Sequence, residues 1–222
     1  MRLLSAPDFI PARYPVALPD AEIHVWYFAP SGLPSRSHGV DPRLPRLLAG
    51  YLGWNEADLR FDRGVHGKPS LRAPARLEFN LSHSGGALLI GIGGAQPLGV
   101  DLEVRSRQRP GLELARRFFD PAEADALARL EPPRQQAAFL RLWSCKEAVV
   151  KALGHGLSFG LANLSFAIDA DGWPIALNVI QASAGAAREW QIVQLAPTPE
   201  TIGAVAWRGP ERTLRAFAAP DG

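Results

Sequence analysis

The most restrictive feature of this sequence is how often glycine and proline interrupt it. The 222 residues include 21 glycines and 20 prolines, about 18% of the chain where roughly 12% is average. Both residues break regular elements, because proline lacks an amide proton and glycine has unusual conformational freedom. The sequence therefore predicts many short strands and helices, and it argues against a bundle of long helices.

Short apolar segments between these interruptions have the patterns of strands and of helices. Segments with alternating or β-branched residues predict strands, and they cover residues 21–29, 76–82, 87–92, 98–104, 163–169, 173–180, 189–195, 201–207 and 212–217. Segments with helical spacing and capping signals predict helices, and they cover 44–52, a segment that starts at Asp120, and 133–153. Because strands and helices do not alternate strictly, the sequence favours the α+β class over a doubly wound parallel sheet.

The order of these segments predicts two related halves. Each half has a strand, a helix and then several strands, which amounts to a repeat of about 100 residues, an ordinary domain size. We divide the chain into an N-terminal arm at 1–20, an N-terminal half at 21–96 and a C-terminal half at 97–222. Four prolines punctuate the arm, so we expect it to be irregular and to lie on the surface.

Charge and cysteine content exclude several classes of protein. Lys and Arg number 24 against 22 Asp and Glu, a net charge of +2, whereas a nucleic-acid binder usually has a larger, clustered excess. The one cysteine, Cys145, rules out an internal disulfide and a cysteine-based zinc cluster, and it suits a reducing cytoplasm. No apolar run approaches the roughly 18 residues that a membrane span needs, and we find no signal-peptide pattern.

Two carboxylates alternate along the strand expected at 98–104. Because successive side chains of a strand point to opposite faces, Asp101 and Glu103 lie on one face, and Val100 and Leu102 lie on the other. Mg²⁺ prefers one or two carboxylates together with waters and phosphate oxygens. The alternative is an amphipathic strand with a solvated acidic face, and the motif by itself favours that alternative.

The helix expected at 133–153 carries a second charged motif. Its apolar stripe includes Cys145, which predicts a packed thiol, while Ser144, Glu147 and Lys151 lie on roughly the opposite side. Glu147 and Lys151 are four residues apart, so the simplest interpretation is a surface ion pair worth a few tenths of a kcal/mol. The functional alternative is a carboxylate beside a lysine, which suits phosphate chemistry.

A third cluster lies where the strand expected at 76–82 ends. Ser82 and His83 are adjacent, so they face opposite sides of a strand and do not form a nucleophilic pair. His83 fits a structural role and a phosphate-binding role about equally well, and Lys68 in the preceding loop is most simply a solvated lysine. Together the acidic and lysine motifs predict metal-assisted phosphate chemistry.

In this order, the motifs resemble those of the 4′-phosphopantetheinyl transferases of the larger, pseudo-dimeric class typified by the surfactin-synthetase activator. The resemblance covers about residues 65–160 and rests on the following segments, with the family pattern in parentheses: Gly67–Pro69 (GKP), Phe79–Ser84 (FNxSHS), Gly99–Glu103 (GVDxE), Phe118–Glu123 (FFxxxE), Trp143–Lys151 (WxxKEAxxK) and Gly154–Leu157 (GxGL). The long WxxKEAxxK motif at this spacing makes the set specific.

The resemblance implies two similar α/β halves packed as a pseudo-dimer within one chain, with the active site in the cleft between them. It implies transfer of the 4′-phosphopantetheine arm of coenzyme A to a serine of an apo acyl or peptidyl carrier protein, with release of 3′,5′-ADP. The enzyme would depend on Mg²⁺, and we expect a cytoplasmic monomer without nucleic-acid or membrane partners. The nucleophile belongs to the carrier, which explains why no nucleophilic triad is found in this chain.

Position by position, the resemblance assigns roles to individual residues. Asp101, Glu103 and Glu147 would bind Mg²⁺ with the pyrophosphate. Glu147, directly or through water, is the candidate base for the carrier serine. Lys151 would stabilise or protonate the leaving phosphate. The catalytic residues that the resemblance implies are thus Asp101, Glu147 and Lys151. The residues expected to contact coenzyme A are Lys68, Ser82, His83, Lys151, Arg43 and Arg46.

One departure from the family pattern leaves an alternative open. The family usually has a longer, arginine-rich segment where this chain has residues 30–45, so the way in which the adenine-phosphate pocket is completed is not fixed. The alternative is a non-catalytic module that binds coenzyme A or a carrier protein, although the intact acidic and lysine motifs argue against it. Phe118, Phe119 and the loop at 105–117 are candidates for carrier contact, whether the carrier serves fatty-acid, polyketide or nonribosomal-peptide synthesis.

Overall fold

A computed structural model describes residues 1–13, 17–30, 41–65, 67–72, 76–107 and 109–219 of the chain. Within these residues the α-helices are α1 (Arg43–Leu52), α2 (Gly111–Phe118), α3 (Pro121–Ala128) and α4 (Pro132–Leu153). The strands are β1 (Arg2–Ser5), β2 (Phe9–Pro11), β3 (Glu22–Phe28), β4 (Phe61–Arg63), β5 (Pro69–Leu71), β6 (Glu78–Ser84), β7 (Ala87–Gly93), β8 (Leu98–Val104), β9 (Leu164–Ile168), β10 (Pro174–Ile180), β11 (Trp190–Ala196), β12 (Thr201–Arg208) and β13 (Thr213–Ala219).

Two main sheets form the centre of the molecule. One has the strand order β2-β13-β3-β7-β6, and the other has the order β1-β11-β12-β8. Strands β4 and β5 pair as a small separate sheet, as do β9 and β10. Parallel and antiparallel pairs occur within each main sheet, and the helices do not alternate regularly with the strands, so the predicted α+β class is confirmed.

Both ends of the chain cross between the two halves that the sequence predicts. β1 pairs in parallel with β11, and β2 pairs in parallel with β13, so the expectation of an irregular arm is wrong for these segments. Leu4 and Phe9 anchor them, because both side chains are buried between the sheets. β13 in turn pairs with β3, and the division after residue 96 therefore does not separate the two sheets.

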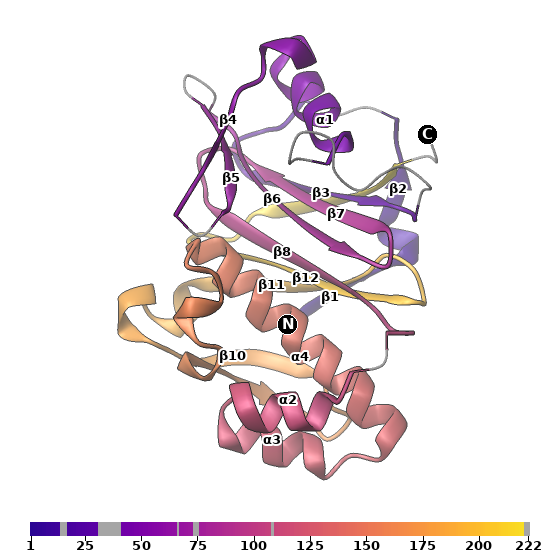
Figure 1. The fold of residues 1–222 in the computed structure, drawn as a ribbon, viewed down its shortest axis with the longest axis vertical. Helices are drawn as coiled ribbons and strands as arrows, with labels where there is room; N and C mark the ends of the chain where they lie inside the picture. The colour runs from indigo at the N-terminus through magenta and orange to yellow at the C-terminus, as the bar shows by residue number, and fades with distance from the viewer. Residues whose placement is uncertain (14–16, 31–40, 66, 73–75, 108, 220–222) are drawn as a thin grey trace.

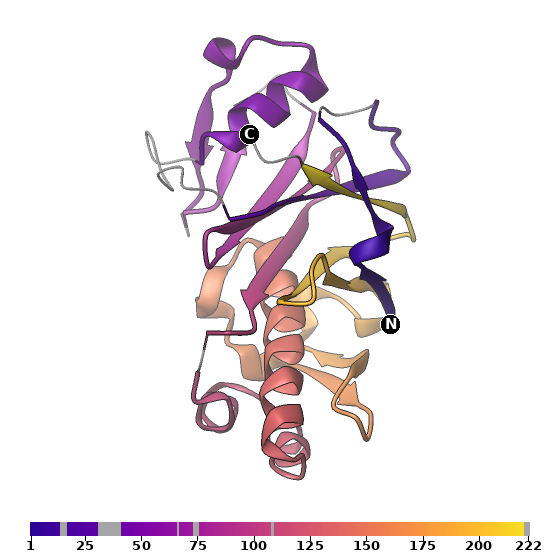
Figure 2. The same cartoon turned by 90° about the vertical axis from the view of Figure 1, so that its right-hand side faces the viewer.

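Alternation along the strands sorts the core into three clusters. Val25 of β3 and Val100 of β8 belong to the cluster between the two sheets. Trp26 faces the other way and packs with Leu48 of α1, while α4 packs against the second sheet through residues that include Cys145, which is buried as predicted. In Figures 1 and 2 the layers accordingly run from α1 through the two sheets to α4.

The region expected to be a loop at 105–117 contains a helix instead. Helix α2 begins after Pro110 and packs against α4. Leu112, Ala115 and Phe119 follow at helical spacing and supply the apolar side of this short element, and tertiary contact stabilises it where local pattern alone is weak. None of the helices in the described residues is long and apolar enough to cross a membrane.

Candidate functional site

The acidic strand β8 is the free edge of its sheet, and side chains of β6 bind the backbone amides on that edge. Alternate β6 side chains accept these N–H groups: Asn80 Oδ1 from Val100 (2.8 Å), Ser82 Oγ from Leu102 (3.2 Å) and Ser84 Oγ from Val104 (3.0 Å). We call this arrangement the side-chain ladder. It joins the edges of the two main sheets and explains why polar residues recur at every second position of β6.

The side-chain ladder also holds the two carboxylates of β8. Ser82 Oγ donates a hydrogen bond to Asp101 Oδ1 at 2.9 Å, and Ser84 Oγ donates to Glu103 at 3.3 Å. The carboxylates lie on one face of β8, as strand alternation predicts, yet Asp101 is 4% and Glu103 is 5% exposed. The interpretation of a solvated acidic face is therefore wrong.

Gly99 lets helix α4 lie directly against β8. A Cβ atom at position 99 would be 2.9 Å from the carbonyl carbon of Lys151, and nearer still to the Ala148 oxygen and the Ala152 nitrogen. Its backbone φ lies outside the left-handed region, so the position requires the absence of a side chain and not the conformational freedom of glycine. This close approach places Glu147 and Lys151 of α4 beside Asp101.

Lys151 and Glu147 both face Asp101. Lys151 Nζ lies 2.7 Å from Asp101 Oδ1 and 3.0 Å from Ser82 Oγ. The ion pair of Lys151 is thus with Asp101 rather than with Glu147, and the interpretation of a surface pair on α4 is wrong. Burial raises the pKa of Glu147 to about 7, and the charges of Asp101 and Glu103 also raise it against the opposing effect of Lys151.

Two carboxylate oxygens of this cluster, Asp101 Oδ2 and Glu147 Oε1, are buried and have no hydrogen-bond partner among the described residues. Such atoms are costly, and a divalent cation would satisfy both. Glu103 is committed elsewhere, because the Arg109 guanidinium lies 2.9 Å from its carboxylate and also lies over the Trp143 ring.

The expected trio of metal-binding carboxylates is therefore not assembled. In the described part of the chain, no group of three or more His, Cys, Asp or Glu side chains could hold a metal ion as placed. The pair of Asp101 and Glu147 nevertheless fits Mg²⁺, an ion that takes one or two carboxylates and completes its coordination with water and phosphate oxygens.

A second charged cluster joins the start of α1 to the end of β6. Asp41 is 2% exposed, and its carboxylate accepts hydrogen bonds from the Arg43 guanidinium and lies 2.9 Å from His83 Nε2. Burial raises the pKa of Asp41, but the hydrogen bonds from Arg43 and His83 outweigh it and hold the pKa below its ordinary value. Sequence analysis assigned no functional role to Asp41, and its position two residues before Arg43 was the available signal.

Two other residues expected to contact coenzyme A are placed differently. Lys68 is half-buried, and its Nζ donates to the backbone oxygens of Leu98 and Lys151 at 3.2 and 3.1 Å. It therefore binds the C-terminal end of α4 and is not a solvated loop lysine, and burial lowers its pKa. Arg46 lies on the exposed side of α1.

The two phenylalanines expected at the carrier surface have opposite environments. Phe119 is 4% exposed and its ring is stacked on Phe139, with Trp143 beside it. The expectation of carrier contact is therefore wrong for Phe119, because its ring fills the core between α2 and α4. Phe118 at the end of α2 is 38% exposed and stays available.

Two further motif residues form a buried ion pair that sequence reasoning missed. Lys146 Nζ lies 2.6 Å from the Glu123 carboxylate and donates to the backbone oxygen of Leu161 at 2.9 Å. Glu123 also accepts from the N–H of Phe166 at 2.7 Å. The pair links α3, α4 and β9, so these motif residues support the fold of the C-terminal half and do not line the acidic cluster.

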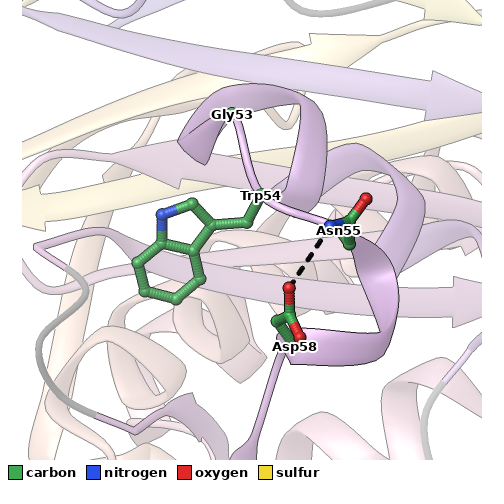
Figure 3. Close-up of a pocket in the computed structure, with 4 residues that line it drawn as sticks. All are labelled: Gly53, Trp54, Asn55 and Asp58. Carbon is green, nitrogen blue, oxygen red and sulfur yellow. Dashed lines mark hydrogen bonds between the residues drawn. The ribbon is translucent and has the colours of Figure 1, made fainter.

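A hollow of about 500 Å³ follows the C-terminal end of α1 (Figure 3). It is lined by Gly53, Trp54, Asn55 and Asp58, and Asn55 Nδ2 donates to Asp58 Oδ2 at 3.4 Å. None of these residues belongs to either charged cluster.

Comparison with known proteins gives consistent matches. Residues 97–207, which include β8 and α4, match the 4′-phosphopantetheinyl transferase superfamily. The chain is 34% identical over 169 residues to the 4′-phosphopantetheinyl transferase HetI of Nostoc sp., a match that covers 75% of this chain and 68% of the relative.

Two relatives from Bacillus subtilis match shorter segments. A 4′-phosphopantetheinyl transferase is 36% identical over 133 residues, covering 60% of this chain and 58% of the relative. The 4′-phosphopantetheinyl transferase Sfp of strain 168 is 35% identical over 119 residues, covering 53% and 51%. The matches thus span about half to two thirds of the length of these three relatives.

Proposed function

Because this chain belongs to the 4′-phosphopantetheinyl transferase superfamily, we propose that it transfers the phosphopantetheine arm of coenzyme A to a serine of an apo carrier protein and releases 3′,5′-ADP. The membership confirms the family and the transferase class that the motifs predict. One observation supports the assignment of residues: two carboxylate oxygens that have no hydrogen-bond partner in the described part of the chain lie with the Lys151 ammonium between β8 and α4. Displacement at phosphorus needs chiefly positioning and charge neutralisation, and this arrangement can supply both.

The cation proposed for this site is Mg²⁺. Asp101 would hold it through Oδ2 and Glu147 through Oε1, together with the pyrophosphate of coenzyme A. Glu103 would join them where Arg109 releases its carboxylate. A bound Mg²⁺ would neutralise charge on the pyrophosphate.

The proposed chemistry assigns proton transfers to the two residues of α4. The carrier serine oxygen forms a bond to the phosphorus atom that carries the pantetheine arm, and the bond from this phosphorus to the 3′,5′-ADP oxygen breaks. Glu147 takes the serine proton, directly or through water, as a positioned carboxylate can. Lys151, held by Asp101, stabilises or protonates the leaving phosphate.

The proposed contacts to the remaining phosphates of coenzyme A come from the N-terminal half. Arg43 and His83 both contact the Asp41 carboxylate, and Arg46 is exposed on the same helix as Arg43. Lys68 and Ser82 would each exchange a hydrogen bond within the protein for a phosphate oxygen.

The proposal places the reaction where the side-chain ladder joins the two main sheets, between the two halves that the sequence predicts. Exposed Phe118 is the proposed contact for the carrier protein. We also propose a cytoplasmic monomer without nucleic-acid or membrane partners. The small net charge and the buried Cys145 support this view.

Transfer to a carrier protein tests this proposal. The purified chain is incubated with coenzyme A, Mg²⁺ and several apo carriers, and the mass of each carrier is measured. The expected result is a gain of one phosphopantetheine arm on serine that disappears when EDTA removes the metal. If no carrier gains mass while a known transferase modifies all of them, the proposal fails. Binding of coenzyme A without transfer would favour the non-catalytic alternative.

A further inference from the structure

The guanidinium of Arg109 holds both oxygens of the Glu103 carboxylate. Its Nη2 atom lies 2.9 Å from Oε1 and 2.9 Å from Oε2, and Ser84 Oγ donates to Oε2 at 3.3 Å. The other two carboxylates of the acidic cluster differ, because Asp101 Oδ2 and Glu147 Oε1 have no hydrogen-bond partner among the described residues. Glu103 is therefore the carboxylate of the three that has both of its oxygens engaged.

The charge of Arg109 acts where the charge of a bound metal ion would act. Burial and the Asp101 charge raise the pKa of Glu103, and the Arg109 charge opposes this rise. The same guanidinium opposes the rise that burial and Asp101 cause in the pKa of Glu147. A buried carboxylate needs a paired charge. Lys151 supplies that charge to Asp101, and Arg109 supplies it to Glu103.

The contact between Arg109 and Glu103 is of a kind that can be exchanged. The strongest pairs of arginine with a carboxylate use two guanidinium nitrogens in a planar fork, whereas Nη2 alone makes the described contacts of Arg109 with Glu103. The Arg109 side chain is 19% exposed, so water can hydrate the guanidinium after it leaves the carboxylate. Its second neighbour, the Trp143 ring at 5.7 Å, provides the weaker attraction of an aromatic face for a cation.

We propose that Arg109 is a positioning residue that competes with a divalent cation for Glu103. This inference rests on the proposed function for the identity of the ion, Mg²⁺. While the guanidinium holds Glu103, the protein ligands left for the ion are Asp101 and Glu147. Glu103 becomes a third ligand only after Arg109 has left it, so the competition lowers the affinity of the acidic cluster for a free ion.

Binding of Mn²⁺, an ion with the same preference for oxygen ligands as Mg²⁺, tests this competition without coenzyme A, carrier or transfer. Electron paramagnetic resonance measures the free Mn²⁺ in solutions of the full chain at about 0.15 M salt. Arg109→Met should tighten Mn²⁺ binding by about 10-fold, the ratio that a net charge-assisted contact gives. Arg107→Met is the matched control, because Arg107 is exposed on the same loop and its described effect on Glu103 is that of its charge alone. Salt screens an exposed charge, so this control should change the affinity by less than about 2-fold.

The Glu103→Gln background separates competition from simple repulsion between the guanidinium and the ion. Competition acts through the Glu103 carboxylate, so Arg109→Met in this background should change the Mn²⁺ affinity no more than Arg107→Met does. Repulsion does not need the carboxylate and would give the same effect of Arg109→Met in both backgrounds.

Thermal melting gives a second measurement on the same variant. Arg109→Met leaves the buried Glu103 carboxylate without its ion pair, so it should melt below the wild type when no divalent ion is added. At one fixed Mn²⁺ concentration its melting temperature should rise by more than that of the wild type, because tighter binding to the folded chain stabilises it more. Should the variant be unfolded in buffer, Mn²⁺ should fold it, whereas NaCl of equal ionic strength should not.

Three results would overturn the inference. The first is an Arg109→Met variant with the Mn²⁺ affinity of the wild type, as a purely structural role predicts, or an unfolded variant that Mn²⁺ does not fold. The second is an undiminished effect of Arg109→Met in the Glu103→Gln background. The third is an equal effect of Arg107→Met. Failure to modify any carrier would refute the proposed function and leave these binding results interpretable.

Discussion

Substitution of Gly99 by alanine tests how the acidic cluster is assembled. The added methyl group would meet only backbone atoms of α4, with the carbonyl carbon of Lys151 at 2.9 Å and two other atoms closer, whereas ordinary contact begins at 3.4 Å. Backbone cannot rotate away as a flexible side chain can, so α4 must move away from β8. Overpacking of this kind costs about 1–3 kcal/mol of unfolding free energy. A displacement on the order of 1 Å at a reacting group can cost about 100-fold in rate.

Two assays measure these effects against a matched control. Urea unfolding should show a midpoint lowered by roughly 0.5–1.5 M, and the transfer rate should fall about 100-fold at a temperature where the variant is folded. Gly94→Ala is the control, because a Cβ at position 94 would have no atom of the described residues within 4 Å, and it should change neither quantity. A Gly99→Ala variant with wild-type stability and rate would refute the argument that close packing of α4 on β8 builds the site.

Three further predictions follow from burial. Burial raises the pKa of Glu147 from an ordinary value of 4.5 to about 7. The folded protein therefore favours the protonated carboxyl, and this contribution to the unfolding free energy is fully present below pH 4.5 and is lost as the pH rises through 7. Glu147→Gln should therefore gain about 2 kcal/mol of unfolding free energy relative to wild type between pH 5 and pH 8, and equal pH profiles in urea would contradict this. Lys146→Met should lose about 3–5 kcal/mol of unfolding free energy in urea, because it leaves the buried Glu123 carboxylate without its ion pair. The double variant with Glu123→Gln should lose less unfolding free energy than the two single variants together. Phe119→Ala should lose about 3–5 kcal/mol of unfolding free energy. Phe118→Ala should stay within about 0.5 kcal/mol of the wild-type value and should raise the KM for the carrier. The reverse order of stability would contradict the placement of these two side chains.

Local periodicity predicted those parts of the structure that depend on local geometry. The strand at 98–104 has the predicted bounds, and its alternation placed Asp101 and Glu103 on one face. The strands predicted at 76–82 and 87–92 correspond to β6 and β7, and the turn between them has positive φ at Gly85 and Gly86. The apolar stripe of α4 correctly assigned Cys145 to the core.

Long-range partners could not be predicted in this way. The spacing of Glu147 and Lys151 within one helix suggested that they pair with each other, but the approach of β8 gives Lys151 a buried carboxylate, Asp101, as its partner. No local pattern indicates that β13, at the end of the chain, lies beside β3. Asp41 has the pattern of a helix cap, and only the position of β6 gives it a second partner.

The initial rate of phosphopantetheine transfer in matched carboxylate variants tests the central claim most directly. Asp101→Asn, Glu147→Gln and the control Glu113→Gln, an exposed carboxylate on α2, are compared with wild type by the mass of an apo carrier. If Asp101 and Glu147 form the reaction site, both variants should lose at least about 100-fold in rate, remain folded, and differ sharply from an unchanged Glu113→Gln. Wild-type rates in either variant would contradict the assignment.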